Sequence, residues 1–174
     1  MREDSGQTEQ PGAPAPSGPS MPSTPTHVVT CFLVRQDRGR DEVLLVRRSE
    51  RVRTYRGHWA GVSGYVEPGI APETQAHTEI AEETGLTGDD IVLLRRGAPL
   101  PVADAAQGLS WVVHPFLFQV RHPARVHTDW EARDAQWVAP AALGGYLTVP
   151  GLAEALARVY PPHELNETAE TGGG

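Results

Sequence analysis

The stretch Gly64–Leu86, GYVEPGIAPETQAHTEIAEETGL, decides the fold and organises the rest of the chain. Pro72 suits the first position of a helix, where its fixed φ is already helical and its missing N–H costs nothing. Gly85 suits the left-handed conformation that ends a helix. Ala76 and Ile80 lie about one turn apart, so they are predicted to pack inward together. The stretch is therefore predicted to be a tight loop followed by one helix.

Glu79, Glu82 and Glu83 stand at i, i+3 and i+4 and so share one face of the predicted helix. Between residues 57 and 94 there are seven acidic residues and no Lys or Arg. Without a nearby cation, each like-charge pair costs roughly 0.2–0.5 kcal/mol. Two readings follow: a solvated acidic face, or a site for Mg²⁺ or Mn²⁺, which prefer carboxylate and carbonyl oxygens. The spacing alone leaves both open.

The same stretch resembles the Nudix box, whose pattern is G-x5-E-x7-R-E-U-x-E-E-x-G-U with U a bulky apolar residue. The residues that match it without a gap are Gly64, Glu79, Ile80, Glu82, Glu83, Gly85 and Leu86. The lead-in GHWAGVSGYVEPG is also similar to the family's longer pattern, at Gly57, Trp59, Gly64, Glu67 and Gly69. The resemblance implies an α/β fold, a Nudix-type α/β/α sandwich with a mixed β-sheet. It also favours the metal-site reading of the acidic face.

The resemblance further implies a reaction and a set of metal ligands. The ligands would be the carboxylates of Glu79, Glu82 and Glu83, with the backbone carbonyl of Ser63. The implied enzyme is a pyrophosphohydrolase that uses Mg²⁺, or Mn²⁺, to cut the diphosphate bond of a nucleoside diphosphate linked to another moiety. Glu82, Glu83 and an acid further along the chain, Glu131, are the implied catalytic residues.

Two positions of the box depart from the family pattern, and in the lead-in Val62 and Ser63 replace the usual Pro-Gly. Ile70 stands where the family has Glu, and Thr78 stands where it has the Arg that holds a neighbouring Glu in its rotamer. We hypothesise that the two family residues support each other and were lost together. The departures also keep open a Nudix-like domain that binds nucleotide without cutting it. Two further readings are a diphosphate isomerase, for which the lone Cys31 is badly placed, and an interaction protein that binds no metal.

A basic segment precedes the acidic one. It contains one acid, Glu50, and five arginines: Arg47, Arg48, Arg51, Arg53 and Arg56. The segment is either a solvated loop or a grip on substrate phosphates, which planar guanidinium groups suit. Arg47 and Arg48, at the end of a predicted strand, are the first choices for substrate binding. Gly64 and Glu67 are the predicted substrate contacts in the loop before the helix.

A polar segment leads to the short predicted strand that carries Trp137. By resemblance, an acid ahead of this strand completes the metal site or acts as the base. Glu131 fits that position best, with Asp129 and Asp134 as rivals, and a solvated loop acid is the other reading. Stacking of Trp130 on a nucleobase is the less favoured interpretation of that side chain.

The remaining elements follow from hydrophobic patterning. Strands are predicted over residues 27–34, 42–48, 57–63, 90–96, 109–120 and 135–138, and a closing helix over 150–160. Gly97–Gly108 is predicted to be a long loop that serves as a lid or specificity loop. Pro115 predicts a bulge or a local edge. His114 and Trp59 are both interpreted as core residues.

Composition sets outer limits. The chain has 174 residues, a net charge of −7, fifteen Arg and no Lys, which argues against a general binder of nucleic acid or anionic membrane. The single Cys31 excludes an internal disulfide and is predicted to be buried. Pro-, Ser- and Gly-rich residues 1–26, and residues 161–174, are predicted to be disordered tails around one domain over 27–160. We expect a cytoplasmic protein with a small-molecule nucleotide partner; a homodimer is left open.

Overall fold

The computed structural model describes residues 24–127 and 132–160 of the 174-residue chain. The two predicted tails fall almost wholly outside these ranges, so their disorder stays a prediction. The first strand begins at Thr26, one residue before its predicted start. No helix of the described residues is long and apolar enough to cross a membrane.

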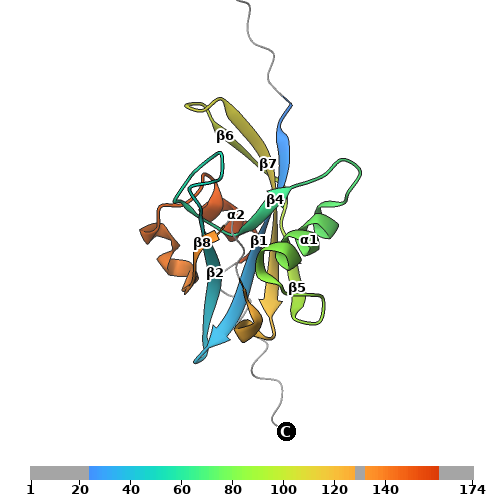
Figure 1. The fold of residues 1–174 in the computed structure, drawn as a ribbon, viewed down its shortest axis with the longest axis vertical. Coiled ribbons are helices and arrows are strands. Elements are labelled where there is room, and N and C mark those ends of the chain that lie inside the picture. The colour runs from blue at the N-terminus through green and yellow to red at the C-terminus, as the bar shows by residue number, and fades with distance from the viewer. Residues whose placement is uncertain (1–23, 128–131, 161–174) are drawn as a thin grey trace, which may run out of the picture.

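Eight strands in the described residues form one sheet (Figure 1). They are β1 (Thr26–Asp37), β2 (Arg40–Arg48), β3 (Trp59–Ala60), β4 (Val62–Tyr65), β5 (Ile91–Arg96), β6 (Leu100–Asp104), β7 (Leu109–Val120) and β8 (Ala132–Val138). The central path is β3-β2-β1-β7-β5, with β4 added to β1, β6 to β7 and β8 to β2. β1 and β7 are parallel and the other pairs antiparallel, so the sheet is mixed, as predicted.

Helices α1 (Pro72–Thr84) and α2 (Leu152–Val159) cover opposite faces of this sheet (Figure 1). Successive residues of a strand point to opposite faces. Cys31 of β1 accordingly belongs to the core under α1, whereas Phe32 belongs to the core under α2, where Leu156 packs. The expected α/β/α sandwich is confirmed. Two 3-10 helices complete the described elements, at Pro123–Arg125 and Pro140–Gly145.

The outer edge of β7 changes partner at Pro115. β5 pairs with β7 as far as Phe116, the Gly97 N–H donates to the Pro115 carbonyl oxygen (2.9 Å), and β6 pairs from Val113 onward. The N and O of one strand residue point to the same side, so the missing N–H of Pro115 faces the place where β5 ends and β6 has yet to begin. The predicted local edge is found there.

The prediction of an unbroken loop over Gly97–Gly108 is wrong, because its middle forms the strand β6. β6 pairs with β7 on one side, so it is an edge strand in which Pro101 is tolerated. The local composition of small residues and Pro favours a loop. The free outer edge of β7, which lies later in the sequence, supplies the pairing that overrides it.

The strand predicted over 57–63 is split in two at Gly61. β3 pairs with β2, whereas β4 pairs with β1. A Cβ on Gly61 would lie 2.9 Å from the carbonyl oxygen of Cys31, so a glycine is needed where the chain crosses from one partner to the other. After the crossing, β4 packs against α1 and brings Ser63 and Gly64 to that helix.

Candidate active site

The helix α1 is fixed at both ends as predicted. Pro72 lies in the first turn, and Gly85 adopts φ 72° with its N–H donating to the Ala81 carbonyl. Glu73 receives two hydrogen bonds from the guanidinium of Arg96 on β5, at 2.6 and 2.8 Å, and these lower the pKa of Glu73. The acidic face of α1 is therefore presented from a helix that is anchored to the sheet.

Glu79 is pressed against the backbone of the loop that precedes α1. A Cβ on Gly64 would overlap with the Glu79 carboxylate, so this approach requires glycine. On its other side, the carboxylate accepts a hydrogen bond from Nε2 of Gln75 (2.8 Å). Glu79 is half-buried as a result.

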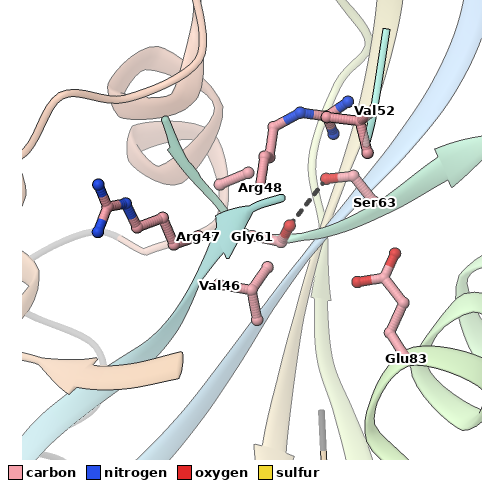
Figure 2. A pocket seen from close by; sticks show the side chains of 8 residues that line it. Val46, Arg47, Arg48, Val52, Gly61, Ser63 and Glu83 are labelled. Atoms are coloured by element: carbon pink, nitrogen blue, oxygen red, sulfur yellow. Dashed lines mark hydrogen bonds between the residues drawn. The ribbon is translucent and has the colours of Figure 1, made fainter. Parts of the chain in front are cut away.

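Glu83 points into a small pocket at the crossing between β3 and β4. Figure 2 shows its carboxylate directed from α1 toward Ser63, whose Oγ donates to the Gly61 carbonyl (3.0 Å). Burial raises the pKa of the Cys31 thiol, and the negative charges of Glu83 and Glu79 raise it further. Glu79 contacts Gly64 of β4 and Glu83 lines the pocket with Gly61 and Ser63, so both carboxylates are directed toward the sheet.

Glu82 is exposed and lines a larger cleft that adjoins the pocket. Glu79, Glu67 and Gly64 line the same cleft, and Ser63 belongs to the walls of both hollows. The predicted site residues of the helix and its loop are thus brought together along one depression. Within residues 24–127 and 132–160, no three His, Cys, Asp or Glu side chains converge closely enough to hold a metal ion.

The chemistry of the donors nevertheless fits a hard divalent cation. The helix offers carboxylate oxygens, and the loop offers backbone carbonyls such as that of Ser63, which are the ligands that Mg²⁺ and Mn²⁺ prefer. The contact between Gly64 and Glu79 also leaves no side chain between the loop backbone and the carboxylate. Glu79, Glu82 and Glu83 are the residues that could hold such an ion.

The first predicted phosphate ligand, Arg47, is engaged elsewhere. Its Nε donates to the Gly57 carbonyl (3.2 Å) and its Nη1 to Asp134 (3.3 Å). Figure 2 shows its side chain directed away from Glu83, although it contributes to the wall of the pocket. A phosphate contact from Arg47 would have to replace these bonds.

Arg48 is better placed than its neighbour. It lines both the pocket and the cleft, while its Nε donates to the Thr54 carbonyl (3.0 Å). Arg51 and Arg53, in the loop that follows, also line the cleft. The cleft therefore has an acidic wall from α1 and a basic wall from the segment after β2.

The cleft also has an aromatic wall, which was not predicted from the sequence. Tyr55 donates to Asp104 of β6 (2.6 Å), and its ring centroid lies 5.9 Å from that of Trp111 on β7. Burial and the bond to Asp104 raise the pKa of Tyr55 to about 12. Both aromatic residues line the cleft, together with Val28, Val102, Val113, Val149 and Pro150. No motif marks these positions, because the wall exists only once the hairpin β6–β7 has formed.

The remaining candidates lie partly outside the described residues. Glu131, Asp129 and Trp130 lie outside the described residues, so their roles stay predictions. The rival acid Asp134 is paired with Arg47.

Two further side chains were interpreted as core residues. Trp59 packs against the core under α2 with its ring against Tyr146, as interpreted. His114 is half-buried and lies 2.9 Å, between ring nitrogens, from His27 of β1. It is therefore paired at the edge of the core rather than enclosed within it.

Comparison with known proteins gives one family for this chain, both from a family model and from a sequence relative. The family model of the NUDIX domain matches residues 25–162. Nudix hydrolase 19, chloroplastic, of Arabidopsis thaliana is 32% identical over 101 residues, a match that spans 58% of this chain and 22% of that protein. This chain thus corresponds to about a fifth of that relative.

Solved structures share the fold. An Ap4A hydrolase of C. elegans superposes with a TM-score of 0.66 at 20% identity, over 76% of this chain and 93% of that one. The NUDIX domain of Shewanella oneidensis NrtR, solved with ADP ribose, gives a TM-score of 0.61 at 17% identity, over 78% and 86%. At these identities, the likeness is one of fold.

Proposed function

Because the chain belongs to the Nudix family, we propose that it is a pyrophosphohydrolase that uses a divalent cation to cut the diphosphate bond of a nucleoside diphosphate linked to another moiety. The observation that carries the proposal is the packing of the Glu79 carboxylate against the Gly64 backbone in a cleft that arginines also line. Carboxylates that can hold a cation beside guanidinium groups that can hold phosphate are the arrangement this chemistry needs.

Each part of the cleft has a role in this proposal. Glu79, Glu82 and Glu83, with the Ser63 carbonyl, hold the cation. When bound, Mg²⁺ or Mn²⁺ acidifies a water molecule and neutralises charge on the phosphate oxygens. A carboxylate that is not fully used as a ligand, Glu82 or the more distant Glu131, accepts a proton from the attacking water.

The basic wall places the diphosphate. Arg48 faces both hollows, and Arg51 and Arg53 extend the positive charge along the cleft. A guanidinium group can donate two parallel hydrogen bonds to phosphate oxygens, which fixes orientation as well as position. Gly64 and Glu67 complete the substrate contacts on the loop before α1.

The aromatic wall orients the substrate. A flat group stacked on Trp111 beside Tyr55 would leave its phosphates on the arginine side of the same cleft. The fold relatives are named for Ap4A or solved with ADP ribose, so adenine nucleotide derivatives are the first compounds to test.

The test is a product screen with purified protein and Mg²⁺ or Mn²⁺. The panel holds nucleoside triphosphates, ADP-ribose, dinucleoside polyphosphates and nucleotide sugars, with products separated by anion-exchange chromatography. We expect cation-dependent cleavage of a diphosphate bond into two phosphate-bearing products. Nucleotide binding by calorimetry without any product would instead support a sensor domain, the alternative that Ile70 and Thr78 keep open.

The aromatic wall makes its own prediction. Trp111→Ala should raise KM for the best substrate roughly tenfold and leave kcat nearly unchanged, because stacking of about 1–3 kcal/mol is lost from ground state and transition state alike. Trp111→Phe keeps an aromatic face and should restore most of the affinity. Steady-state kinetics of both variants decide the point, and an unchanged KM in Trp111→Ala would remove the wall from the binding site.

A further inference from the structure

Gln75 is a polar side chain on the sheet-facing side of α1, with 5% of its surface exposed. Burying an amide costs free energy unless its donor and acceptor are both hydrogen-bonded. The Nudix box pattern specifies no residue at this position, so the resemblance assigns Gln75 no role.

Both ends of the amide are used, and they join the loop to the acidic face. The Gln75 Oε1 accepts a hydrogen bond from the backbone N–H of Glu67 (3.3 Å), while Nε2 donates to Oε1 of Glu79 (2.8 Å). A backbone N–H can only donate, so it fixes the amide oxygen on its own side. The NH₂ group is therefore turned toward the carboxylate.

The residues that depart from the box pattern, Ile70 and Thr78, leave the positioning of Glu79 to another residue. The Oγ1 of Thr78 donates to the Thr74 carbonyl of its own helix (3.2 Å), and the side chain is exposed. Ile70 has no polar group and is 40% exposed. Neither offers Glu79 the charged support that the family's arginine supplies.

We infer that Gln75 is the positioning residue for Glu79 in this chain. Gly64 limits the carboxylate on one side and Gln75 holds it on the other. A neutral donor can fix the rotamer of Glu79 without placing a cationic group beside the carboxylate. The inference rests on the proposed function, because it takes Glu79 to be a metal ligand.

The experiment measures Mn²⁺ binding by isothermal titration calorimetry, without substrate. Gln75→Met keeps the length and volume of the side chain and removes the amide. We expect the Kd for Mn²⁺ to rise roughly 10- to 100-fold, as happens when a group that orients a metal ligand is removed. The melting temperature without metal checks that the variant is folded.

A control variant separates positioning from general loss of a hydrogen bond. Tyr160→Phe removes the bond to Asp41 (2.9 Å), beside the core under α2. It should lower the melting temperature slightly and leave the Kd for Mn²⁺ at the wild-type value. Adding Ile70→Glu and Thr78→Arg to Gln75→Met should bring the Kd back toward wild type, because the family's own pair then replaces the amide.

If Gln75→Met does not fold, Gln75→Asn takes its place. Its amide is one methylene shorter, so it cannot span Glu67 and Glu79 together, and the same loss of Mn²⁺ affinity is expected. Wild-type affinity in the folded variant, with cation-dependent hydrolysis intact in the wild type, would overturn the role of Gln75 and spare the proposed function. Absence of Mn²⁺ binding in the wild type would overturn both.

Discussion

Helices α1 and α2 pack on opposite faces of one sheet, yet they are held by different means. The buried residues of α2 are all apolar: Leu152, Ala155, Leu156 and Val159. Those of α1 are half polar: Gln75, Ala76, Ile80 and Thr84. α1 compensates with an ion pair to β5, a proline at its start and a left-handed glycine at its end.

If the proposed function holds, this difference separates a helix that contributes mainly stability from one that contributes mainly chemistry. α2 contributes apolar burial, whose stabilising effect is non-directional. α1 gives up part of that burial to place carboxylates and the amide that holds one of them. Substitutions on α1 should therefore affect catalysis more than stability, and substitutions on α2 should do the reverse.

The largest effect is expected on α1. Glu82→Gln or Glu83→Gln should lower kcat roughly 1,000-fold, about 4 kcal/mol of transition-state stabilisation, because a cation loses a charged ligand. Removing one of several crowded like charges should leave the melting temperature unchanged or slightly higher. Steady-state kinetics check the expected loss of kcat, and thermal unfolding checks the expected melting temperature. Full activity in both variants would contradict the site.

On α2 a substitution should affect stability more than activity. Leu156 is 6% exposed, so Leu156→Ala should cost about 2–5 kcal/mol of unfolding free energy through lost burial and the cavity left behind. Activity per folded molecule should stay near wild type. Leu147→Ala, at a side chain 67% exposed, is the matched control and should change the urea midpoint little. A large loss of kcat in folded Leu156→Ala would break the division between the helices.

Gly64→Ala tests the contact between the loop and α1. The added Cβ overlaps with the Glu79 carboxylate, so the acid must move. We expect turnover to fall roughly 10- to 100-fold, a range typical of disturbed support for a metal ligand. Gly144→Ala adds the same methyl group where no atom lies within 4 Å, and its kinetics should match wild type. Equal activity of the two variants would show that Glu79 does not need its observed position.

The smallest effect concerns acid stability, away from both helices. Hydrogen bonds from the backbone N–H of Thr87 and from Arg125 and His122 lower the pKa of Asp90 from 3.8 to about 2. The folded state thus favours the ionised carboxylate, and this stabilisation is complete above pH 3.8 and is lost as the pH falls toward 2. The urea midpoint of Asp90→Asn should fall less steeply over this interval than that of wild type. Exposed Asp89→Asn is the matched control, and a slope in Asp90→Asn as steep as wild type would refute the assignment.

Features that depend on local sequence could be predicted, whereas features that depend on contacts between distant segments could not. The ends of α1 were predictable because Pro72 and Gly85 act on their own backbone. The strand β6 was not, because its pairing comes from the edge of β7. Gln75 carried no signal, since its role depends on the loop folding back to present the N–H of Glu67.

The arginines illustrate the same limit. Arg47 and Arg48 are neighbours, and their local sequence favours neither over the other. The basic segment predicts a phosphate contact from either. The fold distinguishes the two arginines, because Asp134 of β8 lies opposite Arg47 and pairs with it. Charge composition predicts that a basic wall exists, whereas tertiary pairing determines which side chains remain directed at the cleft.

The bond between Tyr55 and Asp104 joins two segments that are 49 positions apart. One belongs to the loop that carries the arginines, and the other to the hairpin that carries Trp111. Losing Asp104 would leave the Tyr55 hydroxyl without this acceptor at a partly buried contact, whereas Asp104 keeps its bonds from Ala106 and Gln107. Across related chains, a tyrosine at position 55 should therefore occur together with an acceptor at position 104. A change of substrate would then involve the loop proposed to contact the phosphates and the hairpin proposed to contact the base together, because this bond couples them.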